Sequence, residues 1–147
     1  MGSKWLSGCL LAILSAAPLR AQAPRAAPVS APVANLRYEV AFDSASAARR
    51  TLKVTVTFDV RGRGHVLLSF PAWTPGSYEI SNFAKRVMGF SAHATRAGVI
   101  SDTLDWDKVD YDTWRVQPGN ARSITVSFSF LADTLDTAAA WATADFV

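Results

Sequence analysis

Cysteine is almost absent from this chain. Cys9 is the only one among 147 residues, so no disulfide can form within the chain. Cys9 also lies inside an N-terminal apolar stretch that we interpret below as a cleaved signal. The mature chain would then contain no thiol, which excludes a disulfide scaffold, Cys-ligated zinc and cysteine-based catalysis.

Histidine is nearly as scarce. His65 and His93 are the only two, neither is followed by glutamate, and no second histidine lies four positions away. A helical two-histidine zinc motif therefore cannot be built from this chain. The Gly76-Ser77 step lacks the second glycine of a nucleophile elbow, and no phosphate-binding glycine loop is present. We predict no catalytic, cofactor-binding or metal-ligating residues.

The N-terminus carries the features of an export signal in residues 1–23. Lys4 supplies the positive start, Leu6–Leu19 is mostly apolar, and Ala21-Gln22-Ala23 matches a small-x-small cleavage site. The apolar run is interrupted by polar residues and proline, whereas a membrane span needs ~20 continuous apolar residues. We expect an exported protein, periplasmic or secreted, with no stable membrane span after cleavage. Cys9 ends a lipoprotein-like box, but the apolar segment follows it instead of preceding it, which disfavours lipidation.

The chain has almost no excess of positive or negative charge once the signal is removed. The full chain has a net charge of +3 and a pI of about 9.4. Removal of Lys4 and Arg20 leaves 13 basic residues against 12 acidic ones. A nearly neutral mature chain gives no electrostatic reason to expect a nucleic-acid partner.

A proline- and alanine-rich linker is predicted over residues 24–35. Pro24, Pro28 and Pro32 recur every four residues, a spacing that prevents a helix and favours extended chain. The folded part is expected to begin near Leu36 and to fill residues 36–147.

Period-two alternation of apolar and polar residues dominates the rest of the chain, which predicts β-strands. Short strands with turn signals between them, and no repeated helical pattern, predict an all-β antiparallel β-sandwich of about seven to nine strands. Residues 80–94 fit either helical spacing or a strand broken by a bulge at Gly89, and we favour a turn followed by a strand from about Lys85. The predicted strands are 36–42, 52–60, 65–70, 85–94, 99–104, 106–108, 111–116 and 124–132.

Acidic residues cluster between positions 102 and 112 and could offer oxygen ligands to calcium. The alternation favours another interpretation, in which Trp106 is buried between exposed Asp105 and Asp107, and Tyr111 lies in a strand between Asp110 and Asp112.

The loop after the third predicted strand is the most informative segment. Two prolines bracket a tryptophan, and Pro75-Gly76 predicts a tight turn with positive φ at the glycine. Such a loop is rigid, so it can cover an open end of the sandwich or form a platform for a partner. The candidate contact residues are Pro71, Trp73, Thr74, Pro75, Gly76, Ser77 and Tyr78.

The loop sequence Pro-Ala-Trp-Thr-Pro-Gly-Ser-Tyr at 71–78, with its Phe-Ala-Lys-Arg continuation at 83–86, resembles the N-terminal signature of the glycyl aminopeptidase family. Residues 36–42, 106–116 and 125–131 also resemble strands of that family, so the resemblance covers about residues 36–147.

The resemblance implies a β-rich N-terminal domain that precedes a thermolysin-like catalytic domain with His-Glu-x-x-His zinc ligands, followed by a PDZ domain. None of those catalytic residues occurs in this chain. We therefore expect the domain at 36–147 to be incomplete at its C-terminus and inactive alone, with zinc held by the catalytic domain. Its expected partners are that catalytic domain and, in the whole protein, a peptide substrate.

Two functions remain open from the sequence. The preferred one is a non-catalytic domain that packs on the catalytic domain of an exported zinc aminopeptidase and shapes its cleft. The alternative is a free-standing exported β-sandwich that binds a glycan or a protein.

Overall fold

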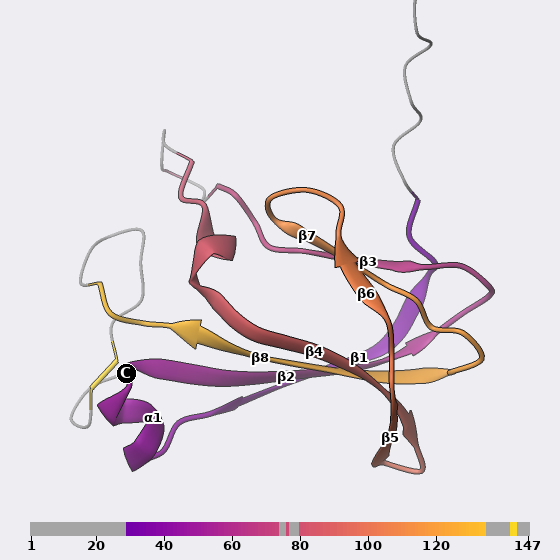
Figure 1. Cartoon of the computed structure of the whole chain (residues 1–147), viewed down its shortest axis with the longest axis horizontal. Coiled ribbons are helices and arrows are strands. Elements are labelled where there is room, and N and C mark those ends of the chain that lie inside the picture. The colour runs from indigo at the N-terminus through magenta and orange to yellow at the C-terminus, as the bar shows by residue number, and fades with distance from the viewer. Residues whose placement is uncertain (1–28, 74–75, 77–79, 135–141, 144–147) are drawn as a thin grey trace, which may run out of the picture.

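A computed structural model of the chain describes residues 29–73, 76, 80–134 and 142–143. It forms two antiparallel sheets that face each other (Figure 1), which confirms the predicted all-β sandwich. The predicted signal at 1–23 lies outside the described residues. The eight strands are β1 (Val33–Ala41), β2 (Thr51–Val60), β3 (Val66–Ser69), β4 (Val87–Arg96), β5 (Val99–Thr103), β6 (Trp106–Lys108), β7 (Thr113–Val116) and β8 (Ser123–Leu131).

The larger sheet has the strand order β1-β2-β8-β4-β5. β2 and β8 pair without a break from Thr51↔Leu131 to Asp59↔Ser123, and they form the centre of the sheet. Their apolar residues alternate with serine and threonine, so one face points to the core and the other is lined with hydroxyls. Across the polar face, Thr57 and Thr125 hydroxyls lie 3.2 Å apart.

The smaller sheet has the order β3-β7-β6, and its strands contain four, four and three residues. It lies over the half of the larger sheet in which β8 begins, on the right in Figure 1. The core between the sheets is built from side chains of both. Its largest fully buried side chains are Phe58, Val66, Val116, Ile124 and Val126.

Two short helices complete the fold. α1 (Ser44–Ala48) begins at Asp43, whose carboxylate accepts a hydrogen bond of 2.7 Å from the Ser46 N–H, while the Ser46 hydroxyl accepts one of 2.6 Å from the Asp43 N–H. This reciprocal capping lets a five-residue helix form between β1 and β2. The second, η1, is a 3₁₀ turn at Phe83–Arg86 that precedes β4. No helix in the described parts of the chain is long and apolar enough to cross a membrane.

The ambiguous segment before the fourth strand contains both expected features. Phe83–Arg86 is a helical turn, and the strand begins at Val87, two residues later than predicted. The bulge predicted at Gly89 is confirmed, because the pairing of β4 with β8 shifts register between Met88 and Ser91 and Gly89 has a φ of 61°.

One expectation from the proline spacing and two from the alternation are wrong. β1 begins at Val33, so the last three residues of the predicted linker are in the sheet. Trp106 is 41% exposed instead of buried, because β6 is the edge strand of the smaller sheet. Tyr111 lies in the turn before β7, and that strand starts only at Thr113.

The hairpin between β4 and β5 gives a prediction on stability. Arg96 pairs with Val99, so Ala97 and Gly98 form a two-residue turn in which both have positive φ, 50° and 79°. Alanine is strained in this conformation, whereas asparagine tolerates it. We expect Ala97→Asn to raise the free energy of unfolding by about 0.5–1 kcal/mol in denaturant titrations.

The matched control for the hairpin is Ala45→Gly in α1, where the backbone is helical. Glycine there should lower stability by about 0.5–1 kcal/mol. A loss of stability in Ala97→Asn would contradict the assigned turn.

Candidate functional site

An apolar groove of about 300 Å³ opens between the two sheets. Both sheets contribute to it: Tyr38 comes from β1, Leu68 from β3, Trp114 from β7 and Phe128 from β8. The groove exists because the short strands of the smaller sheet do not extend over the whole inner face of the larger one. Its lining is dominated by aromatic and aliphatic side chains, which is typical of a binding surface and not of an acid–base site.

Phe70, the residue after β3, joins the two sheets across this groove. Its ring packs edge-to-face on Phe128 at 5.4 Å between centroids and on Trp114 at 6.0 Å, and it stacks on Phe130 at 6.0 Å. Each such aromatic pair adds about 0.5–1.5 kcal/mol to the free energy gained by burial alone. Phe90 continues the cluster by stacking on Trp114 at 5.2 Å.

The predicted contact loop begins at the rim of this groove. Pro71 lines the groove, and the next residue, Ala72, accepts a 2.8 Å hydrogen bond from the Ser81 N–H, which closes the base of the loop. Trp73 is 53% exposed. Gly76 has a φ of 89°, which confirms the positive φ predicted there. Thr74, Pro75, Ser77 and Tyr78 lie outside the described residues.

Arg86 fastens the far end of this segment to the larger sheet. Its guanidinium donates hydrogen bonds of 2.7 Å to the Asp133 carboxylate and 2.8 Å to the Thr134 hydroxyl, just after β8. The hydrogen bond from Arg86 lowers the pKa of Asp133 below its ordinary value of 3.8. This role of Arg86 could not be predicted from a local sequence pattern, because its partners lie 47 and 48 residues further along the chain.

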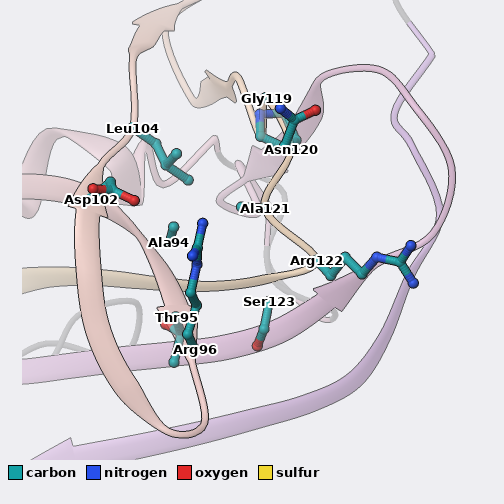
Figure 2. A pocket seen from close by; sticks show the side chains of 11 residues that line it. Ala94, Thr95, Arg96, Asp102, Leu104, Gly119, Asn120, Ala121, Arg122 and Ser123 are labelled. Atoms are coloured by element: carbon teal, nitrogen blue, oxygen red, sulfur yellow. The ribbon is translucent and has the colours of Figure 1, made fainter.

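A second hollow, of about 530 Å³, lies at the opposite end of β8. It is bounded by the β4–β5 hairpin and the turn at residues 118–122. Figure 2 shows Arg96 extending between these two elements and Asp102 on the hairpin, while the Arg122 side chain points away from the hollow. The hydroxyls that line the hollow interact with groups outside it, because Thr95 lies 2.7 Å from the Thr125 hydroxyl and Ser123 donates to the Phe58 carbonyl. Within the described residues neither hydroxyl is hydrogen-bonded to a base, so the hollow shows no nucleophile–base pair.

The candidate ligands from the sequence do not gather into a metal site. His93 lies in β4 of the larger sheet, and His65 precedes β3 of the smaller one. Asp107 pairs with Arg115, and this hydrogen bond lowers the pKa of Asp107 below its ordinary value. No group of three or more His, Cys, Asp or Glu side chains that could hold a metal ion occurs within the described residues. These residues therefore do not fit a catalytic zinc.

Comparison with known proteins gives the family. Residues 37–147 match the family described as the Peptidase M61 N-terminal domain. The chain belongs to this family. An aminopeptidase N family protein of Idiomarina loihiensis has a similar crystal structure, with a TM-score of 0.62 and 21% identity over 74% of this chain. A comparison with curated proteins finds no significant match.

The Idiomarina protein is much longer, and this chain spans only 17% of it. At 21% identity this similarity shows the fold of the chain alone. The family match agrees with the resemblance found in the loop at 71–78, and it assigns the chain to an N-terminal domain of a peptidase family.

The Arg86–Asp133 pair predicts acid sensitivity of the M61 N-terminal domain. A carboxyl whose pKa is lower in the folded state stabilises the fold above its unfolded pKa, and this contribution is lost as the pH falls through the folded value. We expect the melting temperature of the wild type to decrease when the pH is lowered below about 4. Asp133→Asn should have a lower melting temperature than the wild type near neutral pH, and its melting temperature should depend less on pH in the acid range.

Asp102→Asn is the control for the acid titration, because Asp102 forms no ion pair among the described residues. It should leave the acid profile unchanged. Equal profiles for the wild type and Asp133→Asn would refute the role of the pair.

Proposed function

We propose that this chain is the non-catalytic N-terminal domain of an exported, zinc-dependent aminopeptidase. In this proposal the domain packs on the catalytic domain of the same polypeptide through the apolar groove and the loop that begins at Pro71, and so shapes one side of the cleft. Zinc and peptide hydrolysis belong to the catalytic domain.

The observation that carries the proposal is the position of the signature loop beside the groove. Pro71 belongs to both, and Trp73, two residues further along the loop, is 53% exposed. An apolar groove next to an exposed aromatic side chain has the composition of a protein-contact surface, where tryptophan and tyrosine are enriched. The same composition supplies no group that could activate water or bind a metal.

The second candidate is a free-standing exported module that binds a glycan or a protein. Exposed aromatic residues favour it, since Trp73, Tyr111 and Tyr38 are all more than half exposed. Aromatic rings on a rigid sheet are common platforms for sugars and peptides. This candidate predicts saturable binding of a ligand by the isolated chain.

Two observations decide between these functions. In the first proposal, the reading frame that continues beyond Val147 in the source genome encodes a His-Glu-x-x-His motif, and the 147-residue chain alone hydrolyses no aminopeptidase substrate with or without added zinc. A frame without the motif, or hydrolysis by the isolated chain, would refute it.

The loop contact has its own test in the longer polypeptide. We expect Trp73→Ala to lower kcat/KM about tenfold, because displaced cleft walls misplace the substrate. Tyr111→Ala is the matched control, since Tyr111 is similarly exposed (55%) but lies in the β6–β7 turn. Equal kcat/KM values for the wild type and Trp73→Ala would show that the loop takes no part in the proposed contact.

A further inference from the structure

β1 is an edge strand whose outer side has no described partner. It is nine residues long, and it pairs with β2 on one side only. Proteins usually protect such an edge with proline, a bulge or inward-pointing charges, because unpaired backbone groups can bind another strand. A bulge is present between Ala34 and Arg37, but from Arg37 to Ala41 the pairing with β2 is regular.

The core side of β1 is apolar and exposed. Tyr38 pairs with Val56 and Val40 with Val54, so these side chains lie on the face of the sheet that carries the core. Tyr38 is nevertheless 66% exposed and Val40 58% exposed. A strand added beside β1 would therefore bury apolar surface on this side in addition to forming main-chain hydrogen bonds.

The sequence of β1 is complementary to itself when two copies run antiparallel. With Tyr38 opposite Tyr38 of the second copy, Leu36 lies opposite Val40, and Arg37 lies opposite Glu39. Both charged residues are exposed, on the polar side of the strand, and neither forms an ion pair within the described residues. A two-fold axis through Tyr38 then gives two opposite-charge pairs on one face and apolar pairs on the other.

We propose that β1 joins two copies of this chain edge to edge, with Tyr38 on the two-fold axis, to form one continuous ten-stranded sheet. The proposal is not argued from the peptidase assignment, because it is based on the free edge and the sequence of β1. Tyr38 is the residue that it shares with the groove.

The other edge of the larger sheet does not offer the same pairing. β5 has five residues, and in a two-fold pairing centred on Ser101 its Asp102 would lie opposite Ile100. Such a pair has no opposite charge and places a carboxylate beside an apolar side chain. The charge complementarity therefore favours β1 as the self-pairing edge.

Charge exchange tests the proposed register. The oligomeric state of the protein purified after export is measured by sedimentation velocity at protein concentrations from about 1 µM to about 1 mM. In this range we expect a reversible equilibrium between monomer and dimer. Arg37→Glu and Glu39→Arg each place like charges opposite each other twice, so each should raise the dissociation constant at least about tenfold. The double exchange restores both pairs and should return the constant to within about threefold of the wild type.

The control for charge exchange is Arg96→Glu, which reverses a charge on the β4–β5 hairpin, away from β1. It should leave dimerisation unchanged, and all variants should keep the wild-type circular dichroism spectrum. The proposal would be overturned if the wild type stayed monomeric over the whole concentration range, or if the single charge exchanges left the dissociation constant unchanged. It would also be overturned if the double exchange did not restore dimerisation, or if Arg96→Glu weakened the dimer as much as the single exchanges do.

Cysteine cross-linking tests the two-fold axis directly. In a Cys9→Ser background, Tyr38→Cys places the same residue opposite itself, so mild oxidation should give a covalent dimer. Val40→Cys would lie opposite Leu36 and should remain largely monomeric under the same conditions. Efficient cross-linking at residue 40 and none at residue 38 would overturn the register.

Discussion

The difference in size between the two sheets is the constraint on which the rest of this structure depends. Strands of three and four residues in β3, β6 and β7 face strands of nine and ten residues in β2, β4 and β8. The core closes tightly only where both sheets are present, around Phe58, Ile124 and Val126. Elsewhere the inner face of the larger sheet stays open, and aromatic rings around Phe70 cover part of it. A domain built in this way exposes apolar surface, and such surface is characteristic of a contact region.

The difference in sheet size also explains why the open surface of the domain is apolar. The groove is lined by rings and aliphatic groups, and two acidic residues outside it, Asp107 and Asp133, form ion pairs with arginines. Arg86 and the hydrogen bond between Ala72 and Ser81 hold the segment after β3 at the groove rim. The family match assigns the chain to the N-terminal domain of a peptidase family, and the groove gives this domain an apolar surface of the kind that proteins use for contacts.

Much of the fold could be predicted from the sequence, because alternation in β2 and β8 is regular and glycine marked both the bulge at 89 and the turn at 76. Alternation shows on which side of a strand a residue lies, but not whether a second sheet reaches that side. Alternation also does not show which strand is at an edge: Trp106 packs on Phe90 at 4.9 Å between ring centroids, but it is 41% exposed because β6 is an edge strand. The groove could not be predicted, since Phe70, Trp114 and Phe128 meet only through the packing of strands far apart in the chain. The self-complementarity of residues 36–40 has meaning only once β1 is known to be an edge strand.

Hydrogen–deuterium exchange tests the central claim, that the groove side of this domain is its contact with the rest of a peptidase. Exchange in the 147-residue chain would be compared with exchange of the same residues in the longer polypeptide. The account predicts added protection at Leu67–Trp73 and no change at the turn of Gly119–Arg122, which lies at the other end of β8. Added protection at that turn alone, or at neither place, would contradict it.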